Sequence, residues 1–282
     1  MIIYKKYNQQ ELDLQYNNRF HVPGFENYLQ RWEKLSSSAR KQYKVYQDIP
    51  YGDRSRECLD IFSSPNPFSK TVVFIHGGYW QKFDKTLFHF IAGAFVSYGT
   101  TTVLINYPLA PDVSIDQIVK SCSEAISWIN KNSASFNGDA DQIYIAGHSA
   151  GAHLAAMLMT AEEKQKHRTS IKGVCAISGL FNLTPIQLSN INEVLKMDKE
   201  TAIRNSPVFK EPVEQCPLLV AVGGEETNEF LDQSMELYSK WKNKTSSIEL
   251  IVMPGLNHFS LLDSFCDANS LLHQSMCKLM KM

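Results

Sequence analysis

The chain has 282 residues, which is enough for one large α/β domain and calls for no second one. Hydrophobic residues make up 44% of it and charged residues 20%, an ordinary composition for a globular protein. Its formal net charge of −1 and the lack of any run of ~20 apolar residues favour neither nucleic acid nor a membrane as a partner.

The predicted elements begin with a helical N-terminal segment over residues 1–42. Five apolar side chains fall at helical spacing along it, namely Phe25, Tyr28, Leu29, Trp32 and Leu35. One interpretation is that this face packs on the main domain, which we favour. The other is that the same aromatic face also roofs the functional site.

Strands and helices alternate over most of the remaining chain. Two strands near 43–47 and 56–62 would form an antiparallel edge around a turn at residues 50–53. Further strands are expected near 71–75, 101–105, 142–146, 171–177, 217–222 and 247–253. Helices are expected near 84–98, 114–131, 150–163, 229–243 and 262–280. This alternation predicts an α/β fold with a mostly parallel sheet of about eight strands and helices on both faces, and ligands then bind at the carboxyl ends of the strands.

A glycine-containing loop follows the predicted strand at residues 71–75. It reads His76-Gly77-Gly78-Tyr79-Trp80. Glycines let the main chain approach a substrate oxygen closely, so the N–H groups of Gly77 or Gly78 are candidate donors to an oxyanion. We expect the imidazole of His76 to brace the loop, and Tyr79 and Trp80 to line an aromatic wall for the substrate by stacking. The alternatives are an ordinary turn for the glycines and simple packing for the two aromatic residues.

A Gly-x-Ser-x-Gly motif joins the predicted strand at 142–146 to an apolar helix. It reads Gly147-His148-Ser149-Ala150-Gly151. In such a sharp strand–turn–helix crossing, a Cβ at either glycine would clash, and the serine hydroxyl is held above the sheet edge. This pattern is typical of the α/β-hydrolase fold. It makes Ser149 the candidate nucleophile and the N–H of Ala150 a second oxyanion donor.

Residues 180–215 form a long stretch without predicted strands. Three prolines interrupt it, at positions 185, 207 and 212. We predict that this stretch is a small cap inserted into a single domain that spans residues 1–282.

A base and an acid are expected after the serine, in the order serine, acid, histidine. Among the eight histidines, His258 lies in a loop between the last predicted strand and the last helix, where the general base belongs. The loop after the strand at 217–222 holds three glutamates. Glu229 has a sufficient role at the start of the next helix, while spacing alone leaves Glu225 and Glu226 equal candidates for the acid.

The six cysteines include no Cys-x-x-Cys pair, and the first residues include no apolar signal-peptide region. We therefore expect reduced thiols and a cytoplasmic protein. The sequence holds no His-Glu-x-x-His, no phosphate loop and no dinucleotide-binding glycine fingerprint, so it supports no metal and no cofactor. A homodimer is an open possibility for its assembly.

The joint pattern resembles the kynurenine formamidase (arylformamidase) branch of the esterase/lipase α/β-hydrolases. The resemblance rests on the motifs at 76–80 and 147–154, on Asn257-His258-Phe259, and on the N-terminal segments 16–19 and 21–23. In that family the acid lies three residues before a Glu-Phe pair, here Glu229-Phe230, which implies Glu226. Many relatives have Asp at that place, so the glutamate is a departure in side-chain length.

The resemblance implies hydrolysis of N-formyl-kynurenine to kynurenine and formate, on a small-molecule substrate with an aryl amide or ester bond. A carboxylesterase acting on short-chain acyl esters is the alternative, because the same triad cleaves either bond. A non-catalytic binding protein is disfavoured because serine, carboxylate and histidine are all present in the right order. A membrane-acting lipase is disfavoured because residues 180–215 are too polar for an apolar lid.

Overall fold

The computed structural model describes residues 1–167, 169, 171–213 and 216–282. Its eight strands are β1 (Val45–Pro50), β2 (Cys58–Phe62), β3 (Ser69–Ile75), β4 (Thr101–Ile105), β5 (Gly138–His148), β6 (Ile171–Ile177), β7 (Pro217–Gly223) and β8 (Ser247–Met253). The α-helices are α1 (Gln9–Gln15), α2 (Asn18–His21), α3 (Phe25–Gln42), α4 (Phe90–Val96), α5 (Ile115–Asn132), α6 (Ala150–Met157), α7 (Ala161–His167), α8 (Thr184–Leu188), α9 (Asn192–Leu195), α10 (Lys199–Arg204), α11 (Asn228–Trp241), α12 (Ser260–Cys266) and α13 (Leu271–Leu279). Short 3₁₀ helices are η1 (Lys85–Phe88), η2 (Ser133–Phe136) and η3 (Pro207–Phe209).

The strands form one sheet in the order β1-β2-β4-β3-β5-β6-β7-β8. Strand β2 pairs antiparallel with β1 and with β4, and every other pair is parallel. The predicted α/β fold, with a mostly parallel sheet and an antiparallel edge, is confirmed.

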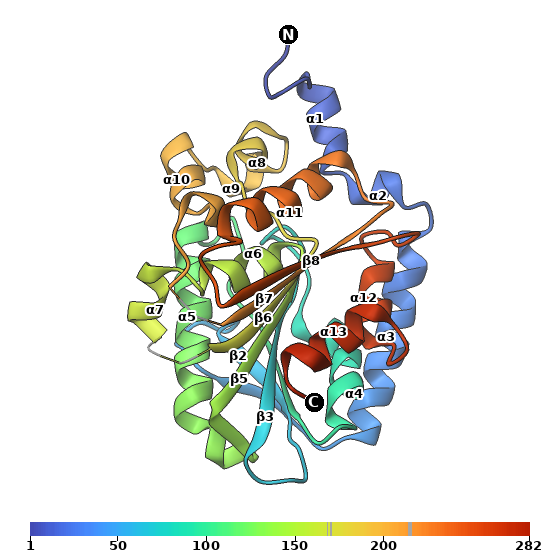
Figure 1. Cartoon of the computed structure of the whole chain (residues 1–282), viewed down its shortest axis with the longest axis vertical. Helices are drawn as coiled ribbons and strands as arrows, with labels where there is room; N and C mark the ends of the chain where they lie inside the picture. Colours follow the sequence, from blue (N-terminus) through green and yellow to red (C-terminus); the bar gives the residue numbers. More distant parts are fainter. Residues whose placement is uncertain (168, 170, 214–215) are drawn as a thin grey trace.

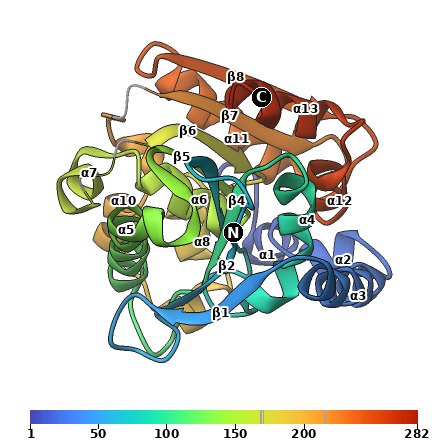
Figure 2. The same cartoon turned by 90° about the horizontal axis from the view of Figure 1, so that it is seen from below.

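Helices cover both faces of this sheet (Figures 1 and 2). Strand β3 shows why both faces are apolar: Val73 and Ile75 belong to one buried cluster, and Val72 and Phe74 belong to the other. The first cluster includes residues of α5, α6 and α11, and the second includes residues of α3, α4, α12 and α13. Because side chains alternate along a strand, a continuous apolar run such as β3 is stable only between two helical layers.

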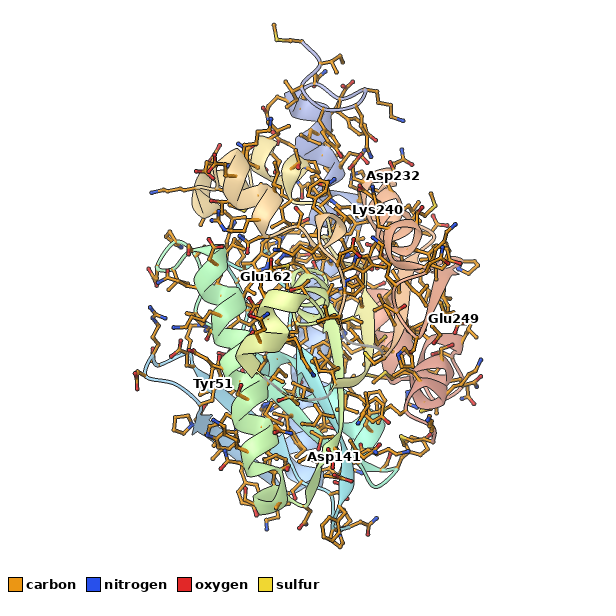
Figure 3. The ribbon with its side chains drawn as sticks, turned by 60° about the vertical axis from the view of Figure 1, so that its left-hand side comes forward. Tyr51, Asp141, Glu162, Asp232, Lys240 and Glu249 are labelled. Carbon is orange, nitrogen blue, oxygen red and sulfur yellow. The ribbon has the colours of Figure 1, made fainter. Side chains whose placement is uncertain are left out.

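Charged side chains on the outer elements point away from these layers. Figure 3 shows Asp232 and Lys240 on α11 and Glu249 on β8 pointing away from the sheet. Strand β8 is an edge of the sheet, and a charge such as Glu249 on an edge strand opposes pairing with another chain. In the part of the chain that the structure describes, no helix is long and apolar enough to cross a membrane.

Several predicted elements are divided in the structure. The expected helix at 84–98 becomes η1 and α4, the one at 150–163 becomes α6 and α7, and the one at 262–280 becomes α12 and α13. In the last case the side chain of Ser270 accepts a hydrogen bond from the N–H of His273 and starts a new helix. The N-terminal segment likewise forms three helices, because Gly24, with φ 76°, separates α2 from α3. Its first residues are not helical; Tyr4 and Tyr7 form an isolated β-bridge.

The first strand begins at Val45, two residues later than predicted, because Tyr43 is still bonded to α3 as its C-terminal cap. The segment at 180–215 contains α8, α9, α10 and η3, while residues 214 and 215 lie outside the described residues. In Figure 1, α8 and α9 lie near α1 at the end of the molecule above the carboxyl ends of the parallel strands.

Candidate active site

Ser149 lies at a sharp turn between β5 and α6. Its backbone has φ 57° and ψ −121°, in the left-handed half of the map that a side-chain-bearing residue rarely adopts. A Cβ added to Gly147 would collide with the main chain of Gly151, and one added to Gly151 would collide with the carbonyl of Ile75. The N–H of Ser149 donates to the carbonyl of Ile177 at 2.8 Å, which ties the turn to the next strand. The local geometry is that of a nucleophile elbow.

The loop after β3 passes directly beside this serine. A Cβ on Gly77 would lie 2.9 Å from the Cβ of Ser149, so only a glycine allows so close an approach. Gly78 has φ 110°, and a side chain there would collide with the carbonyl of Lys82. Ala150 opens α6, where the first N–H groups have no carbonyl partner inside the helix. The main chain of Gly77, Gly78 and Ala150 is therefore gathered around Ser149.

His76 braces the glycine loop, as predicted. Its Nδ1 donates to the carbonyl of Gly77 at 2.8 Å, and its ring stacks on Tyr107 with centroids 4.5 Å apart. The hydroxyl of Tyr107 donates to the carbonyl of His76 at 2.8 Å. Burial lowers the pKa of His76 to about 4, so the ring is neutral and can hold this bonding pattern at pH 7.

Arg56 fixes the outer part of the same loop. Its guanidinium donates to the carbonyls of Tyr107 at 3.0 Å and Phe83 at 2.8 Å. Arg56 lies in the turn before β2, and its bonds hold this turn against a loop in which Tyr79, Trp80 and Phe83 all have positive φ. Side chains at positive φ are strained, and such a loop persists where neighbouring groups hold it.

The two aromatic residues of the loop have different places. Tyr79 lines the cavity above Ser149, and its hydroxyl donates to the carbonyl of Tyr16 at 2.6 Å. Trp80 is fully buried, and its Nε1 donates to Nδ1 of His153 at 3.3 Å. His153 can accept there because its Nε2 donates to the carbonyl of Asn205 at 2.7 Å. The prediction that Trp80 lines a substrate wall is therefore corrected: the packing alternative accounts for it.

His258 and Glu226 meet at the carboxyl ends of β8 and β7. Nδ1 of His258 donates to Oε2 of Glu226 at 2.7 Å, and the carboxylate side chain is 1% exposed. The other oxygen, Oε1, accepts from the N–H of Gly223 at 2.8 Å and from the hydroxyl of Ser178. Glu225 points to solvent. The structure thus brings Glu226 and not Glu225 to the histidine.

Sequence reasoning missed the position of His148, because no local pattern places it beside His258. Its Nε2 donates to the main-chain carbonyl of His258 at 2.9 Å, and the two rings have centroids 4.5 Å apart. On another side Phe230 lies 4.8 Å from the His258 ring. Burial, followed by the proximity of His258, holds the pKa of His148 well below its usual value. A neutral His148 thus fixes the loop that carries His258.

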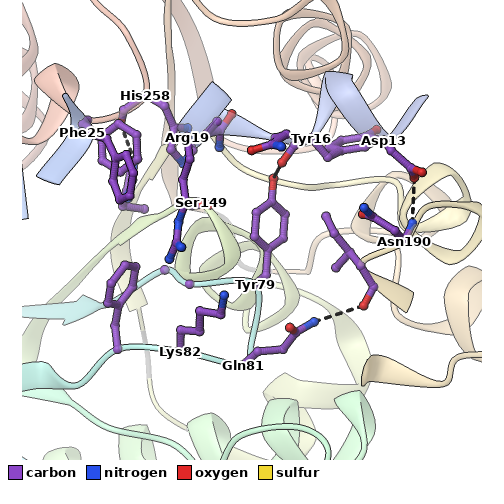
Figure 4. Close-up of a pocket in the computed structure, with 18 of the residues that line it drawn as sticks. Asp13, Tyr16, Arg19, Phe25, Tyr79, Gln81, Lys82, Ser149, Asn190 and His258 are labelled. Atoms are coloured by element: carbon purple, nitrogen blue, oxygen red, sulfur yellow. Dashed lines mark hydrogen bonds between the residues drawn. The ribbon is translucent and has the colours of Figure 1, made fainter. Parts of the chain in front are cut away.

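A cavity of about 370 Å³ connects these residues (Figure 4). Ser149, His258 and the glycine loop form one side of it. Tyr16, Asn17 and Arg19 from the N-terminal segment, together with Phe25 and Trp32 of α3, form the other side. Both interpretations of the N-terminal aromatic face therefore hold, since α3 packs in the buried cluster against the sheet and also roofs the site.

Polar bonds hold the N-terminal segment over the cavity. The buried hydroxyl of Tyr16 donates to Glu229 at 3.2 Å, and Thr227 donates to the carbonyl of Gln15 at 2.7 Å. Lys5 pairs with Glu229 at 3.0 Å. Glu229 is thus more than a helix-start residue, because its 1%-exposed carboxylate anchors the N-terminal segment.

Within residues 1–167, 169, 171–213 and 216–282, no group of three or more His, Cys, Asp or Glu side chains is arranged to hold a metal ion.

Comparison with known proteins agrees with this geometry. The BD-FAE family model matches residues 59–253. The chain is 31% identical to the kynurenine formamidase of Danio rerio over 98% of each protein. It is 32% identical to the kynurenine formamidase of Salmo salar, over 86% of this chain and 84% of that protein.

The fold has solved counterparts as well. A crystal structure of a protein from Silicibacter sp. TM1040 superposes with a TM-score of 0.85 at 29% identity, covering 96% of this chain and 99% of that one. The chain is therefore a hydrolase that belongs to the kynurenine formamidase family of α/β-hydrolases.

Proposed function

We propose that this enzyme hydrolyses N-formyl-kynurenine to kynurenine and formate, with Ser149, His258 and Glu226 as its catalytic triad. The observation that carries the proposal is the 2.7 Å bond from His258 to the buried Glu226, in a cavity that Ser149 also lines. A carboxylate on Nδ1 leaves Nε2 as the basic nitrogen, which is the tautomer that a general base for serine requires.

In this mechanism His258 takes the proton of Ser149 while the hydroxyl oxygen attacks the formyl carbon. The carbonyl oxygen becomes an oxyanion that accepts hydrogen bonds from the N–H of Gly77 or Gly78 and of Ala150, and each donor contributes about 3 kcal/mol to the transition state. His258 then gives the proton to the aryl nitrogen as the C–N bond breaks, which leaves a formyl ester on Ser149. Water, deprotonated by His258, cleaves this ester, releases formate and restores the serine.

The cavity suits an aryl substrate. Phe25, Phe83, Phe259 and Tyr79 contribute aromatic side chains to its walls. Such walls favour a flat leaving group, while the narrow space between Gly77 and Ser149 favours an acyl group as small as formyl. Asn190, Ile191 and Glu193 also line the cavity, so in this proposal residues 180–215 act as its cap.

The test is kcat/KM of the purified protein on N-formyl-kynurenine, p-nitrophenyl acetate and p-nitrophenyl butyrate. We expect the formamide to be preferred by several orders of magnitude, and Ser149→Ala to lose turnover of all three while keeping the wild-type unfolding temperature. Preference for the esters with weak formamide cleavage would instead make the protein a carboxylesterase. Full activity of Ser149→Ala would overturn the triad.

A further inference from the structure

Two cationic side chains line the cavity from opposite elements. Arg19 belongs to α2, and Lys82 belongs to the loop after β3. Figure 4 shows Arg19 extending from α2 down into the cavity, with Lys82 extending upward from the facing loop. Among the described residues, neither side chain forms an ion pair of the kind seen at Arg56 with Asp84 or Lys85 with Asp60. Cations without a carboxylate partner in a substrate cavity are available to bind an anionic group of the substrate.

Arg19 is held in place although it is exposed. Its guanidinium lies over the ring of Phe25, 5.0 Å from the centroid, and cation–π contact of this kind limits where the group can move. The side chain of Asn17 caps α2 by accepting from the N–H of Phe20. The 2.6 Å bond from Tyr79 to the carbonyl of Tyr16 then connects this end of the chain to the glycine loop.

Lys82 is placed by the same glycine loop. Its N–H donates to the carbonyl of Gly78 at 3.1 Å, so its position is coupled to the oxyanion donors. The preceding side chain, Gln81, donates to the carbonyl of Ile191 at 3.1 Å and fixes the loop against the segment at 180–215. Both cations therefore stand on elements that are bonded to the reaction centre.

The acidic side chains around the cavity define the charge of the ligand. Asp13 is already engaged, since it accepts from the N–H of Asn190 at 2.8 Å and from Gln9 at 3.1 Å. Glu193 also lines the cavity and is exposed. Two cations beside two carboxylates leave this lining without net formal charge, which suits the carboxylate and ammonium of an amino-acid end better than a doubly charged phosphate.

We propose that Arg19 and Lys82 form a binding site for the carboxylate of the substrate, the group that 2′-formamidoacetophenone lacks. This site rests on the proposed function and deepens it, because it makes the enzyme selective for aryl formamides that carry an amino-acid carboxylate. Arginine and lysine bind a carboxylate by charge-assisted hydrogen bonds. Such bonds in a solvated cavity correspond to roughly a 10- to 100-fold effect on affinity.

The test compares N-formyl-kynurenine with 2′-formamidoacetophenone, which keeps the aryl formamide and ketone but lacks the amino-acid end. Arg19→Gln is expected to lower kcat/KM for N-formyl-kynurenine about 10- to 100-fold through KM, with kcat and turnover of 2′-formamidoacetophenone unchanged. Lys82→Gln should have a smaller effect of the same kind, and Arg19→Lys should retain part of the selectivity. Raising the ionic strength should raise KM for N-formyl-kynurenine alone, because it screens the contact of its carboxylate with the two cations.

Lys120→Gln is the matched control, since Lys120 lies on α5 and its pairing with Glu124 is exposed and outside this cavity. It should leave both substrates unaffected. Equal losses on the two formamides in Arg19→Gln would show that the residue acts through the shape of the site and would overturn the carboxylate assignment.

Binding measurements distinguish the proposed carboxylate site from the proposed reaction. In the Ser149→Ala background, calorimetry should find N-formyl-kynurenine bound more tightly than 2′-formamidoacetophenone, and Arg19→Gln should abolish the difference. If wild type cleaves neither formamide but this difference persists, the proposed reaction fails and the anion site stands. If the two ligands bind equally, the anion site fails whatever the enzyme cleaves.

Discussion

The floor and the roof of the cavity are built in different ways. The floor consists of the loops that follow β3, β5, β7 and β8 and carry Gly77, Ser149, Glu226 and His258. The roof consists of α1, α2, the first half of α3, and residues 190–193 of the segment at 180–215. Main-chain contacts too close for a side chain fix the floor, whereas side-chain hydrogen bonds to a few anchors such as Glu229 fix the roof. We expect the floor residues to determine which bond is cleaved, and the roof residues to determine which substrate is selected.

The largest effect is expected at the floor, from Glu226→Gln. A glutamine can offer its NH₂ group to His258 and favour the wrong imidazole tautomer, so we expect kcat to fall by about 10³- to 10⁴-fold on formamide and ester alike. Glu225→Gln is the matched control, because Glu225 is exposed. Kinetics of the two variants decide between the acids, and a loss that follows Glu225 would refute the assignment.

The same division explains what could be predicted from the sequence. The apolar runs and the motifs at 76–78 and 147–151 are local signals, so the sheet is confirmed and the tight turn at Ser149 has the expected geometry, while the oxyanion role of the glycine loop stays a prediction. Glu225 and Glu226 could not be separated from spacing, because one faces solvent and the other faces His258 only once β7 and β8 lie side by side. Tyr79 and Trp80 are neighbours in sequence, and nothing local indicates which ring faces the cavity.

Most contacts of the roof cannot be predicted from local sequence patterns. The spacing of aromatic residues predicted α3, but its contact with the site depends on how α2 crosses the loop after β3. Arg19 and Lys82 lie 63 positions apart in the chain, and in sequence they look like ordinary surface residues. The divided helices also depend on single capping side chains such as Ser270, which a periodicity over a long window does not detect.

A second prediction concerns His148, which lines the cavity and donates to the main-chain carbonyl of His258. His148→Phe removes the donor to the His258 carbonyl while keeping a flat ring, and we expect kcat to fall about tenfold on every substrate, with KM nearly constant. His148→Gln can still donate and should recover part of the loss. Because this role is positioning, the variant should also shift the pH profile of kcat, since His258 would lose a fixed orientation to Glu226. A change in KM alone would contradict it.

A third prediction concerns the hydrogen bond from Tyr16 to Glu229, which holds the roof in place. Tyr16→Phe removes the hydroxyl that donates to the buried Glu229, and an under-bonded buried carboxylate should lower the free energy of unfolding by about 1–3 kcal/mol. We expect KM for N-formyl-kynurenine to rise a few-fold while kcat on p-nitrophenyl acetate stays constant. Tyr98→Phe, at an exposed tyrosine just after α4, is the control for urea unfolding. A loss of kcat on the ester would mean that floor and roof are not separable.

The smallest effect on activity, but a distinct one on stability, is expected from the buried His153 beneath the floor. Burial lowers the pKa of His153 to about 4 in the folded chain, against about 6.5 in an unfolded chain. Between these two pKa values the unfolded chain binds a proton that the folded chain does not, so acid favours unfolding. His153 alone then lowers the free energy of unfolding by about 1.4 kcal/mol for each pH unit that the pH falls. Below the folded pKa both states are protonated, and above 6.5 neither is, so the free energy of unfolding no longer depends on His153 in either range. His153→Gln keeps a donor and an acceptor for Asn205 and Trp80 but does not titrate. Urea unfolding at several pH values from 4.5 to 6 should therefore show a weaker pH dependence of the unfolding free energy in the variant, by about one proton. Activity at pH 7 should change little. The same pH dependence in both proteins would mean that His153 is protonated in the folded chain.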